Sequence, residues 1–314
     1  MASVDDPARQ LAAELAVARP GVSRRTLGLY LFCYLGLAPV LLLFLYLRVI
    51  PIVTTLFAGF YNWDMIRPIR VFVGLSNYVE LLRDPNFQNA LSNTAILAAG
   101  SVILGTVLAL ALAVTVNARV TGAPIYQLIY FLPVVTPWVP VTVVWKWIYD
   151  ARFGPLNAAL VALGLPPQAW LVEDTLALIA ILIVMVWKTL GYNLIMFLVG
   201  LNNIPQEYYE AAVVDGAAGG KIFRYITLPL LRPMLLFVVV ISTINAFNVF
   251  TPVFMMTSDI QGAAAKLVRT LVYDMWENGF RYFKVGYASA EAALLLLIVL
   301  MLTLMHMRLF REDR

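Results

Sequence analysis

The chain has 314 residues, of which 62% are hydrophobic and only 13% are charged. Soluble domains are about 45–50% apolar and about 25% charged, so this composition predicts an integral membrane protein with no soluble domain of ordinary size. The net charge of +4 is explained better by basic loops beside an anionic leaflet than by nucleic-acid binding. One cysteine, Cys33, and one histidine, His306, exclude an internal disulfide and a structural zinc site.

We expect residues 1–27 to form a polar tail and residues 28–311 to form one transmembrane domain. A helix needs about 20 apolar residues to cross a bilayer, and six runs are long enough. The sequence therefore predicts an all-α integral membrane protein with six transmembrane helices. Prolines interrupt the first, third and fifth runs, and the six extend over about Leu29–Phe57, Ala90–Val116, Ile125–Tyr149, Leu176–Leu201, Met234–Met256 and Val285–Leu309.

The stretch Asn202–Pro233 is a long polar interruption between the fourth and fifth runs. Pro205 suits the first turn of a helix, where no backbone N–H is required. Gly216 allows a sharp bend, because glycine has no Cβ to restrict its backbone. A second short helix should follow and end before Pro229. The pattern predicts a helix–turn–helix hairpin held between two membrane spans.

The residues of this hairpin resemble the EAA loop of ABC-importer permeases. Glu210-Ala211-Ala212 is followed after three residues by Gly216, and nine residues later by Ile226-Thr227-Leu228-Pro229. The resemblance implies the type I importer permease fold, with this loop as a cytoplasmic coupling helix docked on an ATPase subunit. The alternative is a surface hairpin without a special role. The residues expected to couple to the ATPase are Glu210, Ala211, Ala212, Asp215, Gly216, Ile226, Leu228 and Pro229.

Other segments resemble the maltose and glycerol-phosphate branch of this family, in its first of two unlike permease subunits. They are Val73–Tyr78 (VGLSNY), Trp145-Lys146-Trp147 with Gly154 and Asn157, and Gly286–Ala290 (GYASA). Two features depart from the family pattern. Thr257 is followed by Ser-Asp-Ile-Gln-Gly where the family often has a T-x-G-G-P segment, and Glu291 stands where an apolar residue is usual.

The chain carries no phosphate-binding loop, since Gly219-Gly220-Lys221 is followed by Ile222 and not by Ser or Thr. We therefore expect a transport subunit without enzymatic activity or a cofactor of its own, with ATP and Mg bound by the partner ATPase. The resemblance implies a second unlike permease, two ATP-binding subunits and an extracellular or periplasmic solute-binding protein. The expected contacts with the binding protein are the loops Arg67–Asn86 and Ser258–Lys284.

Basic residues are slightly more frequent on the side of the termini and the hairpin, and the loops of the other side are longer. The positive-inside rule thus favours cytoplasmic termini, in agreement with the EAA resemblance. The expected location is the inner or plasma membrane of a bacterial or archaeal cell, with membrane lipid around the spans.

Polar and aromatic residues within spans usually face a bundle interior or a cavity. Amides pair with hydroxyl groups and aromatic rings stack on sugar C–H faces, so such residues suit a polyhydroxylated ligand. The alternative is hydrogen bonding between helices. The residues expected along a substrate path are Tyr192, Asn193, Asn245, Phe247, Asn248, Phe250 and Glu291.

Lys188 and Glu291 are charges at similar depth within spans, where each is costly unless it is paired or near an interface. They are candidates for a mutual contact, or one of them contacts substrate. Trp138, Trp145 and Trp147 are expected in the interfacial belt.

The sequence thus predicts a permease subunit of an ATP-driven importer that carries a sugar, either an oligosaccharide, a disaccharide or a related polyol. One alternative is the same class of importer carrying glycerol 3-phosphate. Another is an ion-coupled secondary transporter, which should show repeated halves and midplane carboxylates. A membrane-embedded enzyme would need converging catalytic groups that the chain lacks.

Overall fold

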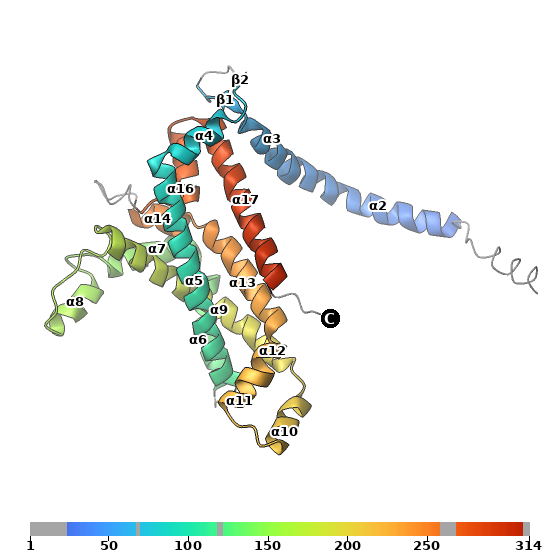
Figure 1. The fold of residues 1–314 in the computed structure, drawn as a ribbon, viewed down its shortest axis with the longest axis vertical. Coiled ribbons are helices and arrows are strands. Elements are labelled where there is room, and N and C mark those ends of the chain that lie inside the picture. The colour runs from blue at the N-terminus through green and yellow to red at the C-terminus, as the bar shows by residue number, and fades with distance from the viewer. Residues whose placement is uncertain (1–23, 67–69, 118–121, 258–267, 310–314) are drawn as a thin grey trace, which may run out of the picture. The chain divides into compact units, whose positions relative to one another are not determined.

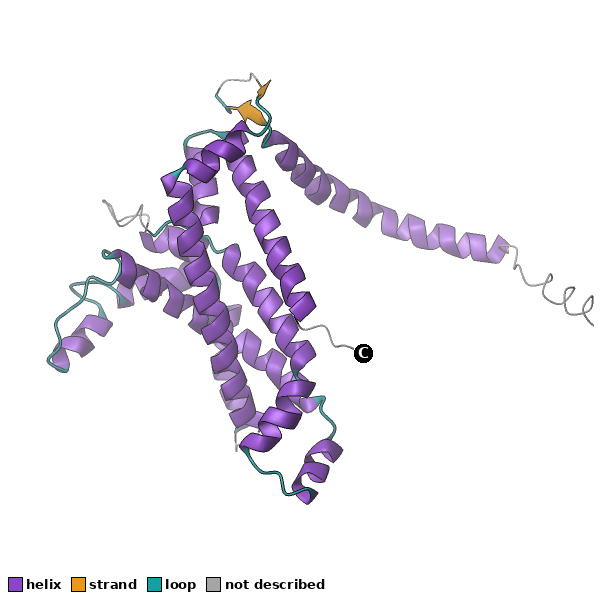
Figure 2. Ribbon diagram, in the orientation of Figure 1, coloured by secondary structure: helices purple, strands orange, loops and turns teal. Residues whose placement is uncertain are grey.

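The computed structural model describes residues 24–66, 70–117, 122–257 and 268–309. The chain divides into two compact units, residues 1–54 and 55–314. Nearly all of the expected polar tail, residues 1–27, lies outside the described residues. In the described residues, helices make up most of both units (Figures 1 and 2).

The described part of the first unit is one helical segment, which ends at Ala58. The segment consists of α2 (Arg24–Phe44), a π-helical turn η1 (Leu45–Val49) and α3 (Ile50–Ala58). Pro39 lies inside α2, so it does not end the helix as its position in the first apolar run suggested. Pro51 follows the π turn, in which Ile50 N–H bonds to the carbonyl of Leu45. A π turn shifts the hydrogen-bond ladder and so accommodates a proline that cannot donate.

The second unit contains fifteen of the described helical elements and two short strands. In chain order the helical elements are α4 (Ser76–Arg83), α5 (Pro85–Asn117), α6 (Ala123–Val135), α7 (Trp138–Ile148), α8 (Pro155–Ala162), α9 (Asp174–Asn202), α10 (Gln206–Val214), α11 (Gly220–Ile222), the π turn η2 (Phe223–Thr227) with α12 (Leu228–Leu230), α13 (Arg232–Phe247), α14 (Thr251–Thr257), α16 (Leu271–Trp276), the π turn η3 (Glu277–Arg281) and α17 (Val285–Leu309).

The strands correct the all-α expectation. β1 (Tyr61–Trp63) and β2 (Arg70–Phe72) form an antiparallel hairpin in which Asn62 faces Val71. The hairpin is fixed by side chains of the VGLSNY segment. Asn77 donates from Nδ2 to the carbonyls of Gly59 (2.8 Å) and Tyr61 (3.0 Å). Asn77 of the VGLSNY segment therefore has a structural role, which is to hold the backbone at the start of the strand hairpin.

Five helical stretches are long and apolar enough to cross a membrane, or six if α6 and α7 form one bent span. The five agree in position with the predicted runs, and they are Leu27–Ala58, Pro85–Asn117, Thr175–Asn202, Arg232–Thr257 and Val285–Leu309. The run expected as the third span, Ile125–Tyr149, is not one continuous helix. It bends by 100° between α6 and α7. Thr136 is extended there (φ −74°, ψ 130°), because a residue before proline is disfavoured in the helical region.

Helix α5 is the central element of the second unit and packs against α9 and α13. Small residues recur every three or four positions along its buried face: Ala98, Ser101, Gly105, Ala109 and Ala113. Such a stripe lets the neighbouring helix backbones approach closely, which is how helices associate in membranes.

Helix α9 passes through two separate apolar cores. Its first half, including Ile181 and Val184, belongs to a cluster with α5, α14 and α16. Its second half, including Leu194 and Phe197, belongs to a cluster with the other end of α5 and with Val238 of α13. The turns of α9 between these cores carry polar residues, and a cavity lies beside them.

Candidate functional site

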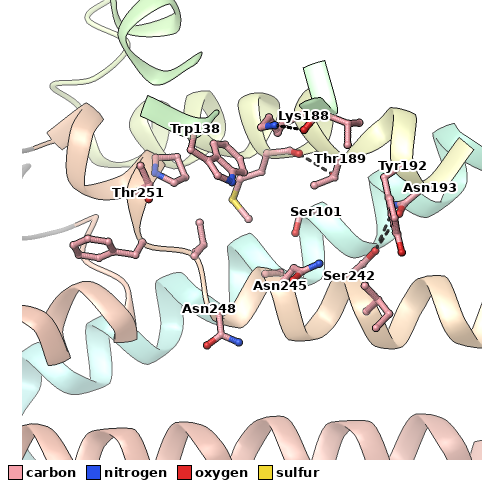
Figure 3. A pocket seen from close by; sticks show the side chains of 17 residues that line it. Ser101, Trp138, Lys188, Thr189, Tyr192, Asn193, Ser242, Asn245, Asn248 and Thr251 are labelled. Atoms are coloured by element: carbon pink, nitrogen blue, oxygen red, sulfur yellow. Dashed lines mark hydrogen bonds between the residues drawn. The ribbon is translucent and has the colours of Figure 1, made fainter. Parts of the chain in front are cut away.

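A cavity of about 610 Å³ lies among α5, α6, α7, α9, α13 and α14 (Figure 3). Most of the polar residues around it are neutral amides and hydroxyls. Among the described residues that line it, Lys188 is the one with a charged side chain. The polar lining comprises Ser101, Lys188, Thr189, Tyr192, Asn193, Ser242, Asn245, Asn248 and Thr251, with Trp138 and Phe250 as aromatic walls.

The cavity brings together five of the seven residues expected along a substrate path: Tyr192, Asn193, Asn245, Asn248 and Phe250. The Asn193 amide approaches the Ser242 hydroxyl at 3.4 Å, which links α9 to α13. Asn245 and Asn248 are both exposed, and they lie where α13 ends and the chain turns towards α14. Asn248 donates from Nδ2 to the Ile244 carbonyl at 2.7 Å, so it also closes the end of that helix.

Two expected residues lie elsewhere. Phe247 is 7% exposed and packs in the apolar core shared by α5, α9 and α14. Glu291 is 2% exposed on α17, where it accepts a hydrogen bond from Asn278 Nδ2 at 3.0 Å. The expected contact between Glu291 and Lys188 is wrong, because the Lys188 ammonium donates to backbone carbonyls between α6 and α7. Similar depth in the membrane does not bring two helix faces together.

Trp138, which was expected in the interfacial belt, lines the cavity, and Lys188 Nζ lies 5.4 Å from the centroid of its ring. Trp145 instead packs against Tyr149 and Trp187. A helical period starting from Asn193 would have found Thr189, four residues earlier on α9, but no sequence signal pointed to Ser101 on α5.

Glu291 belongs to a buried polar network between α16, η3 and α17. Arg269 pairs with Asp274 at 2.6 Å and with Glu277 at 2.5 Å, and all three side chains are almost fully buried. Burial lowers the pKa of Arg269, but the hydrogen bond and charge of Asp274 and the charge of Glu277 outweigh it and raise that pKa. Arg269, Asp274 and Glu277 belong to the segment Ser258–Lys284, which was expected to contact the binding protein. Residues 258–267 lie outside the described residues.

The hairpin between α9 and α13 has the expected helix–turn–helix form. Gly216 adopts φ +78°, and Ala217 N–H bonds to the Ala212 carbonyl at 2.8 Å, as in a Schellman motif. The second helix does not end before Pro229 as expected. It continues through α12, because the π turn η2 just before Pro229 shifts the hydrogen-bond ladder at a residue that cannot donate.

The tip of the hairpin presents apolar and acidic side chains together. Val213 and Val214 are 63% and 88% exposed, and Glu207, Glu210 and Asp215 are exposed beside them. Of the other expected coupling residues, Ala211 is exposed and Ala212 is buried, whereas Ile226, Leu228 and Pro229 are half-buried. Within the second unit, the hairpin lies at the end opposite to β1 and β2 (Figure 1). The described residues contain no group of three or more His, Cys, Asp or Glu side chains that could hold a metal ion.

Comparisons with known proteins agree with this architecture. Residues 101–311 match the family model described as "Binding-protein-dependent transport system inner membrane component". The chain is 34% identical over 285 residues to a probable ABC transporter permease protein, YurN, of Bacillus subtilis, covering 90% of this chain and 96% of the relative. It is 32% identical over 282 residues to the trehalose/maltose transport system permease protein MalF of Thermococcus litoralis, covering 89% and 94%.

Among solved structures, a chain in the crystal structure of a bacterial alginate ABC transporter matches with a TM-score of 0.80. That crystal structure is a complex with an alginate pentasaccharide-bound periplasmic protein. The match covers 93% of this chain and 98% of the other, and the sequences are 21% identical. The likeness at this identity establishes the fold alone.

Proposed function

Because the chain belongs to the family of binding-protein-dependent transport system inner membrane components, we propose that it is the permease subunit of an ATP-driven importer for a neutral sugar. The sugar is an oligosaccharide, a disaccharide or a related polyol. The observation that carries this proposal is the chemistry of the cavity, which is lined by amides and hydroxyls together with the aromatic rings of Trp138 and Phe250. Amides pair with sugar hydroxyls, and rings stack against sugar C–H faces.

The size of the cavity suits such a ligand, since small-molecule sites are typically about 300–1,000 Å³. The relative that carries trehalose or maltose by its name supports the same substrate class. Glycerol 3-phosphate fits less well. Its phosphate needs a cation or several free N–H donors, and the three N–H groups of Lys188 are directed at backbone carbonyls.

The hairpin is proposed as the coupling element. Its exposed valines and acids form a compact surface that can fill a groove on an ATPase subunit and pair with basic residues there. Ile204 and Leu231, which flank it, are buried in the core beside α5 and α9. A movement of the hairpin would therefore be transmitted to the spans on either side of it.

The remaining parts of the proposal concern the assembly. The chain works with a second, unlike permease, two ATP-binding subunits that hold ATP and Mg, and an extracellular or periplasmic solute-binding protein. It spans the membrane six times when α6 and α7 count as one bent span, and both termini are cytoplasmic. Residues 1–27 form a tail and residues 28–311 the transmembrane domain. The opposite ends occupied by the hairpin and by β1 and β2 support this orientation.

The test is uptake by the reconstituted assembly. The chain is co-expressed with its partner subunits and placed in proteoliposomes with ATP inside and the binding protein outside. Radiolabelled maltose, trehalose and sn-glycerol 3-phosphate are supplied in turn. We expect accumulation of at least one of the two sugars that requires ATP and the binding protein, and no accumulation with a non-hydrolysable ATP analogue. Faster uptake of glycerol 3-phosphate, or sugar uptake driven by an ion gradient without ATP, would refute the proposal.

A further inference from the structure

The break between α6 and α7 leaves backbone carbonyls without their ordinary partners. In a straight helix the N–H groups of residues 137 and 140 would bond to the carbonyls of residues 133 and 136. Both donor positions are prolines, Pro137 and Pro140, which have no N–H. A carbonyl left unpaired away from water is costly, so these groups need donors from elsewhere.

A side chain of a neighbouring helix supplies those donors. Lys188 of α9 donates from Nζ to the carbonyls of Pro133 (2.7 Å), Val134 (3.0 Å) and Thr136 (2.7 Å). In Figure 3 a dashed line runs from the Lys188 ammonium to one of these carbonyls. An ammonium group has three N–H donors, so this set uses all of them.

The surroundings of Lys188 fit a cation held for structural reasons. The residue is 7% exposed. Its charge faces the C-terminal end of α6, where the helix dipole favours a cation. About one turn further along α9, Gly191 lies against the backbone of Tyr130, and an added Cβ would clash with the Tyr130 carbonyl. Lys188 and Gly191 thus hold α6 and α9 in close contact.

We propose that Lys188 is the positioning residue of the bent span: it fixes the break between α6 and α7 against α9 by serving the carbonyls that Pro137 and Pro140 leave unpaired. Through Val134 and Trp138, which lie on either side of the break, Lys188 thereby sets one wall of the cavity. It is not a ligand for the transported compound. This role goes beyond the proposed transport function and does not depend on which compound is carried.

The test measures amide hydrogen exchange in the peptide that covers the break, in the intact assembly in nanodiscs. Replacement of Lys188 by methionine (Lys188→Met) keeps a long side chain and removes the three donors. We expect exchange across residues 133–141 to accelerate about tenfold, the factor for losing one buried hydrogen-bonding partner. Exchange in the hairpin peptide, residues 206–222, should stay unchanged.

A second background makes the test specific. Replacing Pro137 and Pro140 by alanine (Pro137→Ala, Pro140→Ala) returns N–H donors to the chain. In that background we expect Lys188→Met to accelerate exchange less than threefold, because the carbonyls have partners of their own. The control is Lys146→Met, at a lysine on α7 that donates to the Met255 carbonyl at 3.4 Å. Its effect should be the same in both backgrounds.

Two results would overturn the proposal. One is an equal effect of Lys188→Met with and without the prolines, which would mean that the side chain does not serve those carbonyls. The other is unchanged exchange at the break together with a raised KM for the sugar that the assembly carries, which would make Lys188 a substrate ligand. Because exchange is measured without substrate, failure here is separate from failure of the proposed sugar transport.

Discussion

The hairpin and the cavity are built in different ways, although both are expected to serve the same transport cycle. The hairpin is one continuous stretch whose shape is set by local features: the end of α10, the left-handed Gly216 and the π turn before Pro229. The cavity takes residues from α5 to α14, and its walls meet only when those helices pack. The first kind of site can be recognised from a motif, whereas the second depends on which helix faces meet.

The two regions also differ in what surrounds them. Most of the charged and apolar side chains at the hairpin tip are exposed, so substitutions there change a contact with a partner. Around the cavity, buried residues such as Lys188 and Asn193 make hydrogen bonds between different elements. Substitutions there change the fold and the ligand site together. Experiments that separate coupling, packing and binding can test this contrast.

The largest effect is expected from Gly216→Pro in the hairpin. Proline fixes φ near about −65°, whereas Gly216 is at +78°, so the turn cannot form. We expect the protein to insert in the membrane and to lose all stimulation of ATP hydrolysis by the loaded binding protein. Gly216→Ala is the matched control. An added Cβ at Gly216 meets no atom within 4 Å, and only the φ strain of about 1–2 kcal/mol remains, so partial stimulation should survive. Full stimulation in the proline variant would contradict the coupling role.

A smaller effect, on stability, is expected from Gly191→Ala beside the cavity. The new Cβ would clash with the Tyr130 carbonyl and push α6 away from α9, at a cost of about 1–3 kcal/mol. Thermal unfolding of the purified protein should detect this loss. The same substitution in the hairpin, Gly220→Ala, meets nothing within 4 Å and should change stability by less than about 0.5 kcal/mol. Equal losses in the two variants would show that the hairpin is packed as tightly as the cavity wall.

A change in binding alone is expected from Asn245→Ala. Asn245 lines the cavity and its removal would delete an amide that can pair with a sugar hydroxyl. One such hydrogen bond is worth about 0.5–1.5 kcal/mol, so we expect KM for the sugar to rise about threefold to tenfold. The maximal rate of uptake should stay close to that of the parent. Hairpin variants should show the reverse, with a lower maximal rate and the same KM. A fall in rate without a change in KM for Asn245→Ala would argue against a role in binding.

The smallest effect lies outside both regions, at Asp150 in the turn after α7. Hydrogen bonds from the backbone N–H groups of Phe153 (2.7 Å) and Arg152 (2.9 Å) hold the pKa of Asp150 below its ordinary value of 3.8. When a carboxyl group has a lower pKa in the folded protein than in the unfolded chain, its ionised form stabilises the fold. This contribution to the free energy of unfolding is fully present at pH values above the unfolded pKa, and it is lost as the pH falls through the folded pKa. The unfolding temperatures of the parent and Asp150→Asn should thus differ slightly at neutral pH and converge once the pH falls below the folded pKa of Asp150. A difference that persists in acid would contradict this cause.

Much of the fold could be predicted from the sequence. Five apolar runs agree with helices long enough to span a membrane, because length and hydropathy are properties of the run itself. The turn at Gly216 followed from glycine's freedom, and it has the expected left-handed conformation. The prolines were predicted less well. The size of the 100° bend before Pro137 was not predicted, and the helix that was expected to end before Pro229 continues after a π turn.

The cavity could be predicted only in part. Tyr192, Asn193, Asn245 and Asn248 were expected there because polar residues within spans usually face a bundle interior or a cavity. Ser101 and Trp138 were not placed there, and Lys188 only as an alternative, since their meeting depends on how α5 and the bent third span pack against α9. Glu291 lies outside the cavity for the same reason. Asn278, its partner, is near in space because η3 folds back on α17.

By itself, then, the sequence determined that the chain lies in a membrane, where its apolar runs are, and that a glycine turn divides a polar hairpin between two of them. These features follow from local sterics, hydropathy and backbone hydrogen bonding. Only the tertiary structure decided which buried charges meet: Lys188 serves the carbonyls of a broken helix, and Glu291 joins a network with Asn278. In an apolar medium a charged side chain needs a polar partner, and the packing of the helices against one another decides which partner lies within reach.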